Sequence, residues 1–318
     1  MPGLFSMNRA TRHQNELNVA LDYSRIEGPA MADPMLHRLN RNSLGRPLYH
    51  FKDPEEFLNG LRSIVICLQK LADLDMCHCD ITISNTSLVA SPNPPNGEEG
   101  FLFDFEYTKL PHSHPLTYNR DMPESVRSAG PVTTGTLQFM AIELLLQFGP
   151  RLGADLAVVA PRVITPTYKS YHDLESLVWV VFYALCKRVL LDLKANSKIH
   201  PSNKAILEQT FQTWFSHKSP EHIAETRSHL ANSVYGHPIP VLEAFKTLME
   251  KVHALLLEDL LQLVWYQKLR TTRRVQPGQP QGKKMTHDIV LSKIALALKR
   301  LHGEEPIPVD EDVLKSQA

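Results

Sequence analysis

A helical stretch that is apolar on every face constrains the fold of this chain more than any other feature. The pattern runs from Tyr171 to about Leu191, and after Asp173 and Glu175 the segment 177–186 holds no charged residue. A helix that is hydrophobic all round has no face suited to water, so other elements have to enclose it. The sequence therefore predicts a central buried helix, with the helical second half of the chain packed around it.

Composition and charge narrow the class of protein without identifying it. Hydrophobic residues make up 43% of the 318 residues, and 34 basic side chains balance 34 acidic ones. An even charge gives no indication of a nucleic-acid or membrane partner. The sequence shows no signal-peptide pattern and no apolar run near the roughly 20 residues that a spanning helix needs. The four cysteines are too few for a disulfide framework. We expect an intracellular protein, cytoplasmic or nuclear.

Helical patterns account for most of the remaining chain. Asp53 is a suitable N-cap before Pro54 at the first helical position, and an apolar face follows to about Leu74. A short helix is expected after Glu143, and further helices are expected over residues 205–215, 220–231, 241–269 and 287–301.

A short segment after the first predicted helix carries polar residues suited to phosphate chemistry. Asp80 and Asn85 lie five positions apart, and Asp104 follows in an apolar run. The β-prone segments 86–90 and 100–105 flank a turn-rich stretch and predict a hairpin. Such a hairpin brings Asn85 and Asp104 to the same end, where two oxygen ligands could meet a divalent cation.

A zinc site is the competing interpretation of the same region. Cys77, His78 and Cys79 are all possible metal ligands. However, structural zinc usually takes two pairs of ligands spaced by two to four residues, and no second cysteine pair is present. We therefore favour the phosphate interpretation.

Four motifs in order resemble a known family. They are His78-Cys79-Asp80 with Asn85, then Asp104-Phe105-Glu106, then Gly135-Thr136 with Ala141-Ile142-Glu143, then His172-Asp173-Leu174-Glu175-Ser176-Leu177. Together they resemble the large, helical lobe of a protein kinase, and more closely the fungal-type protein kinase family. Residues 45–51 also look like the segment that precedes the first helix of that lobe. The resemblance covers residues 38–190.

The resemblance implies a catalytic role for three residues. Asp80 would accept or orient the substrate hydroxyl, and Asn85 and Asp104 would hold Mg²⁺ on the phosphates of ATP. The implied fold is mostly α with small β-hairpins, a kinase-like C-terminal lobe whose small lobe is missing or vestigial. The implied partner is a protein substrate or a binding partner.

Other residues would support these three. By the same resemblance, Gly135 and Thr136 belong to the substrate-binding loop. Glu143 is expected to be the buried acid that staples this loop to the lobe. Asp173 is expected to cap the backbone of the catalytic loop, and His78 to pack at its base.

The sequence also departs from an active kinase. No G-x-G-x-x-G motif is present, and the first lysine of the chain is Lys52, so the ATP-positioning lysine has no candidate. Cys79 replaces the arginine that would pair with an activation-loop phosphate. Three interpretations stay open: a protein serine/threonine kinase, complete or as a truncated sequence; an inactive pseudokinase that acts as a binding scaffold; and a relative of the aminoglycoside-type phosphotransferases.

The expected organisation has five parts. A poorly ordered arm spans residues 1–37 and the kinase-like region spans 38–269. A basic polar linker over 270–285 leads to a C-terminal helix over 286–302 and an acidic tail over 303–318.

Overall fold

A computed structural model of the chain describes residues 45–91, 94–105, 107–109, 137–152, 168–195, 200–216, 219–235, 238–272 and 284–307. The N-terminal arm predicted over 1–37 lies outside these ranges, as do Glu106, Gly135, Thr136, most of the predicted linker and the end of the tail.

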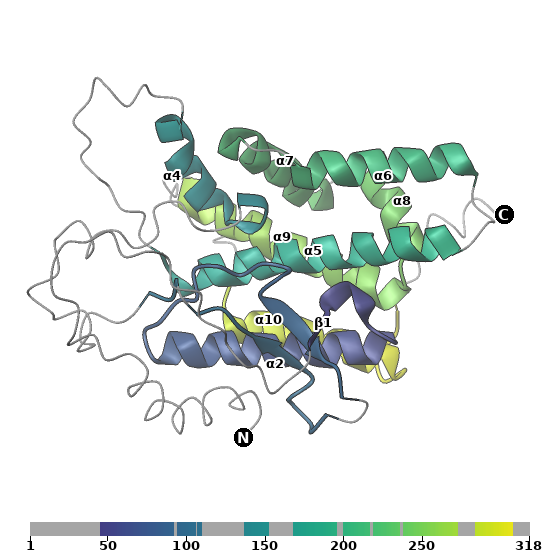
Figure 1. The fold of residues 1–318 in the computed structure, drawn as a ribbon, viewed down its shortest axis with the longest axis horizontal. Coiled ribbons are helices and arrows are strands. Elements are labelled where there is room, and N and C mark those ends of the chain that lie inside the picture. Colours follow the sequence, from purple (N-terminus) through teal and green to yellow (C-terminus); the bar gives the residue numbers. More distant parts are fainter. Residues whose placement is uncertain are drawn as a thin grey trace, which may run out of the picture.

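The predicted central helix is confirmed as α5, Ser170–Ala195. It crosses the middle of the molecule, with α2 on one side and α6 and α7 on the other (Figure 1). Its apolar side chains are almost completely excluded from solvent: Val180, Val181 and Phe182 are each 0% exposed. Helices from both halves of the chain pack against it, including α2, α6, α8 and α9. An all-apolar helix is stable here because every face has a neighbour.

The first predicted helix is α2, Pro54–Asp73, and it begins as its sequence indicates. The Asp53 carboxylate accepts a 2.8 Å hydrogen bond from the backbone N–H of Glu56. The apolar face of α2 packs on both the sheet and α5.

The sheet contains the predicted hairpin and one further strand. Strands β2, Thr86–Val89, and β3, Gly100–Leu102, pair antiparallel, with Thr86 opposite Leu102. Strand β1, Gly45–Pro47, pairs antiparallel with the other edge of β2 and was not predicted as a strand. The sheet lies close against α2, because a Cβ atom added at Gly100 would come within 2.8 Å of the Gly60 carbonyl carbon.

The other predicted helices form, with one correction. They are α4, Ile142–Leu152; α6, Pro201–Ser216; α7, Pro220–Asn232; and α10, His287–Leu301. The single helix predicted over 241–269 is wrong: it is divided into α8, Pro240–Leu248, and α9, Lys251–Thr272. The helix is interrupted at Met249, whose backbone is extended (φ −82°, ψ 157°). Both pieces bury leucines in the same core, so the apolar pattern continues across the break. Short 3₁₀ turns occur at Leu48–His50, Leu137–Phe139 and Ser233–Tyr235.

Helix α10 belongs to the same core although it was predicted to follow a linker. It packs on α2 and α9 and buries Val290, Ile294 and Ala297. The Lys293 ammonium is 2.6 Å from Asp259 on α9. The described residues thus form a mostly helical fold with one small three-stranded antiparallel sheet. Across the described ranges, every helix is too short or too polar to span a bilayer.

Candidate functional site

The segment from Cys77 to Asn85 connects α2 to β2 and forms the centre of the candidate site. It begins at a two-way backbone bridge, in which the Cys77 N–H donates to the Lys109 carbonyl (3.2 Å) and the Lys109 N–H donates back (2.8 Å). At its other end residues 82–85 form a turn. The Asn85 N–H donates to both the Oγ1 (3.1 Å) and the carbonyl (3.2 Å) of Thr82. Both ends of the segment are therefore fixed by hydrogen bonds.

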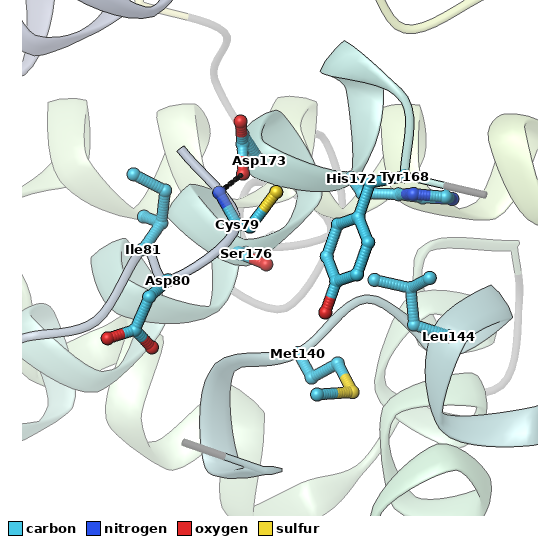
Figure 2. A pocket seen from close by; sticks show the side chains of 9 residues that line it. All are labelled: Cys79, Asp80, Ile81, Met140, Leu144, Tyr168, His172, Asp173 and Ser176. Atoms are coloured by element: carbon cyan, nitrogen blue, oxygen red, sulfur yellow. Dashed lines mark hydrogen bonds between the residues drawn. The ribbon is translucent and has the colours of Figure 1, made fainter. Parts of the chain in front are cut away.

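Asp173, in the first turn of α5, holds the middle of this segment. One carboxylate oxygen accepts from the His78 N–H at 2.7 Å and the other accepts from the Cys79 N–H at 2.9 Å. Figure 2 shows the second of these bonds. Burial raises the pKa of Asp173 to about 7, although the two N–H donors favour its charged form. The contact is the one that the family resemblance implies for this acid.

His78 joins the segment to the end of β3. Its Nδ1 accepts from the Asp80 N–H at 3.3 Å and its Nε2 lies 3.2 Å from the Phe103 carbonyl, so the proton is assigned to Nε2. Burial lowers the pKa of His78 to about 4, which keeps the ring neutral. Its ring also packs at 4.9 Å from Phe105. His78 thereby ties Asp80 to the residues on either side of Asp104.

Asn85 fixes the orientation of Asp80. Its amide nitrogen donates to the Asp80 carbonyl at 3.0 Å and to the Asp80 carboxylate at 2.8 Å. Both residues are buried, with 8% of Asp80 and 5% of Asn85 exposed. Because the amide nitrogen donates to Asp80, the amide oxygen is the atom of Asn85 that is left to accept a hydrogen bond or bind a cation.

Asp104 follows β3 and is exposed. Its backbone is left-handed (φ 69°), and so is that of Cys79 (φ 66°). Left-handed backbone is unfavourable for residues other than glycine and is often concentrated at functional sites. The Phe103 N–H donates to the Asn85 carbonyl at 3.2 Å, so Asp104 comes directly after a residue that is bonded to Asn85.

The donor chemistry of these residues fits Mg²⁺. An amide oxygen from Asn85 and a carboxylate from Asp104 are hard oxygen ligands of the type that Mg²⁺ prefers. The same residues do not suit zinc, which binds cysteine as the thiolate. Burial raises the pKa of the Cys77 thiol to about 12 and raises that of Cys79 as well, so both stay protonated. Among the described residues, no cluster of three or more His, Cys, Asp or Glu side chains has a metal-binding arrangement.

A small cavity is lined in part by Asp80 (Figure 2). The Tyr168 ring enters it from the segment before α5, and its edge meets the His172 ring. Burial raises the pKa of Tyr168, and the negative charge of nearby Asp80 adds to this effect. Tyr168 lies outside every motif, so no sequence pattern pointed to it. The cavity is lined by Cys79, Asp80, Ile81, Met140, Leu144, Tyr168, His172, Asp173 and Ser176.

The expectation that Glu143 is the buried acid at the end of the substrate loop needs correction. The Glu143 side chain is 22% exposed, and it contacts the start of α5 through Tyr171, His172 and Lys169. The fully buried acid is Glu175, which is 3% exposed and accepts a 2.8 Å hydrogen bond from the Ile142 N–H. Like Tyr168, Glu175 is a residue whose role the sequence reasoning missed. The available signal was a second acid, two residues after Asp173, in a helix that is otherwise apolar on all sides.

Comparison with known proteins gives one finding. The family model described as fungal protein kinase matches residues 6–185, which is more than half of the chain. The searches of curated proteins and of solved structures gave no match.

Proposed function

Because the chain belongs to the fungal protein kinase family, we propose that it contains the large lobe of a protein kinase and transfers phosphate from ATP to serine or threonine of a protein. One observation carries this proposal: the Asn85 amide donates to both the backbone and the side chain of Asp80. A carboxylate held in this way is preoriented toward one position, as the positioning of a substrate hydroxyl requires.

Each residue of the site has a role in this proposal. Asp80 accepts or orients the hydroxyl of the substrate. Asn85 and Asp104 hold Mg²⁺, and Mg²⁺-ATP supplies the phosphoryl group when it is bound. Asp173 and His78 keep the loop in place through the backbone bonds described above. Gly135 and Thr136 are assigned to the substrate loop from the family motif and lie outside the described residues.

A binding scaffold without catalysis is the second candidate function. Its support is in the sequence: Lys52 is the first lysine, and it contacts Glu56 at the start of α2 at 3.4 Å. Positioned charge accounts for much of phosphoryl-transfer catalysis, so residues 1–318 acting alone, without a lysine positioned on ATP, would transfer phosphate slowly.

Nucleotide binding is the first test. Thermal denaturation of the full chain is measured with ATP at millimolar concentration, with and without Mg²⁺. The proposal predicts a Mg²⁺-dependent rise in melting temperature that is lost in Asp104→Asn. Asp192→Asn is the matched control, since Asp192 is an exposed acid on α5. No shift in the wild-type chain would reject the proposed nucleotide site and favour the scaffold.

Phosphate transfer is the second test. Labelled ATP is incubated with dephosphorylated casein, and separately with an aminoglycoside, in the presence of Mg²⁺. The proposal predicts label on casein serine or threonine and none in Asp80→Ala. Label on the aminoglycoside alone would assign the chain to small-molecule phosphotransfer.

A further inference from the structure

Arg227 on α7 is buried beneath the segment that follows the substrate loop. Only 4% of this residue is exposed. Its two terminal nitrogens donate to the backbone carbonyls of Gln138 and Met140, and its guanidinium carbon lies 4.8 Å from the centre of the Trp179 ring. An arginine is rarely buried without partners, because losing its hydration costs a great deal. The two carbonyls are therefore part of what makes its burial possible.

Glu175 on α5 holds the next part of the same segment. Its carboxylate caps α4 by accepting from the Ile142 N–H, and the Trp179 indole N–H donates to the same oxygen at 3.4 Å. The charges of Glu175 and Arg227 stabilise each other, although burial still raises the pKa of the acid to about 7 and lowers that of the arginine to about 9. Together, one acid and one base bind three backbone groups between residues 138 and 142.

We propose that Arg227 and Glu175 are positioning residues that lock the segment 138–142, and thereby the exit of the substrate loop, without any phosphorylated residue. This inference rests on the proposed kinase function and adds how its substrate loop is held. Glu175 and Arg227 reach this segment from α5 and α7. Glu143, the residue expected to act here, adds contacts between the start of α4 and the start of α5.

The position of Cys79 supports a lock that is independent of phosphate. In the family motif, this position carries the arginine that pairs with a phosphorylated loop, and here it holds a buried, neutral thiol. A phosphate-binding switch at this site has lost its cation. Arg227 supplies a cation that is bonded to backbone carbonyl groups of the segment, and these groups are always present. Residues 138, 140 and 142 are thus held through their backbone groups, with no phosphate required.

The buried position of Arg227 and the ordered conformation of residues 138–142 stabilise each other. If residues 138–142 moved away, the Arg227 guanidinium would stay buried with two acceptors fewer, which is unfavourable. Conversely, replacing Arg227 leaves two carbonyls, one buried and one partly buried, without their donors. Loss of Arg227 should therefore loosen this segment more than any other part of the molecule.

Arg188→Met is the matched control for Arg227→Met. Arg188 also donates to a backbone carbonyl, that of Phe51 at 2.5 Å, and also stacks on an aromatic ring, at 4.7 Å from the Phe51 centroid. It contacts the segment before α2, so its loss perturbs stability without touching residues 138–142.

The test combines hydrogen exchange with kinetics on the full-length chain. We expect Arg227→Met to speed exchange of the Ile142 amide at least about tenfold, and Arg188→Met to leave it unchanged. In casein phosphorylation, Arg227→Met should raise the KM for casein by about tenfold with the KM for ATP unchanged. Arg227→Lys should rescue only part of the effect, since a lysine cannot reproduce the fork that reaches both carbonyls.

Two results separate the possible failures. If the wild-type chain transfers no phosphate, the proposed function fails, and the exchange rates alone decide whether the lock exists. If Arg227→Met and Arg188→Met give the same exchange at Ile142, or if Arg227→Met leaves the KM for casein unchanged in an active chain, the positioning role is refuted.

Discussion

Asp173→Asn should have an effect on stability that depends on pH. The Asp173 carboxylate accepts two backbone N–H groups in a buried position, and burial raises its pKa from 3.8 to about 7. Asparagine keeps the shape but offers only one oxygen, so its amide nitrogen would face one of the two N–H donors. The substitution removes a hydrogen bond and also removes a buried charge that is costly at neutral pH.

The size of the pH effect follows from the pKa. A carboxyl whose folded pKa is raised stabilises the fold fully below its unfolded pKa, and that contribution is lost as pH rises through the folded value. One pKa unit corresponds to about 1.4 kcal/mol. Between pH 5 and pH 8 the wild-type advantage over Asp173→Asn should therefore fall by about 3 kcal/mol, nearly all of it below pH 7.

Urea denaturation of both chains at pH 5, 6, 7 and 8 measures this difference. Other groups that titrate in this range are common to the two chains, so their contributions cancel in the comparison. Asp192→Asn, which alters an exposed acid on the same helix, is the control. An advantage that stays constant or grows with pH would refute the reasoning, because it would mean that the two N–H donors outweigh burial and keep Asp173 ionised.

Three further predictions concern the frame around the site. Gly100→Ala should destabilise the fold by about 2 kcal/mol or more in urea, because its Cβ would meet the Gly60 backbone. Gly303→Ala has open space around it but a positive φ of 74°, so it should cost less, about 1 kcal/mol from backbone strain alone. His253→Phe should stabilise the chain by about 2 kcal/mol more at pH 5 than at pH 7.5. Burial lowers the pKa of this histidine to about 4, so at pH 5 it is charged only in the unfolded chain, which favours unfolding of the wild type. Equal effects at both pH values would contradict this. Asp53→Ala should cost about 1 kcal/mol by removing the N-cap of α2, measured by thermal or urea unfolding, and no loss would show that the cap is dispensable.

The sequence predicted the fold best where a local pattern and a tertiary demand agreed. Helix α5 was predicted because a segment without a polar face can only be central, and α2 because an N-cap, a proline and an apolar stripe occur together. The hairpin of β2 and β3 followed from β-prone runs around turn residues. Each of these signals lies within one short stretch of chain.

The features that the sequence did not predict depend mainly on contacts between distant segments. Strand β1 is three residues long and exists because β2 offers a free edge, which no pattern around Gly45 reveals. The break at Met249 carries neither glycine nor proline, so the leucine pattern of α8 and α9 reads as continuous. The partners of Glu175 and Arg227 come from segments 33 and 87 residues away, and only packing brings them together.

The two acids at the start of α5 explain how one helix could set the geometry of both loops. Asp173 and Glu175 are two residues apart, so at about 100° per residue their side chains leave the helix on nearly opposite sides. One holds the backbone of His78 and Cys79, and the other caps α4 at Ile142. Their position near the helix N-terminus favours negative charge, which offsets part of the cost of burying two carboxylates. The loop that carries Asp80 and the segment that follows the proposed substrate loop are thus anchored to the same two turns of an enclosed helix. Their separation is fixed by helix geometry, and a shift of α5 would move both loops together.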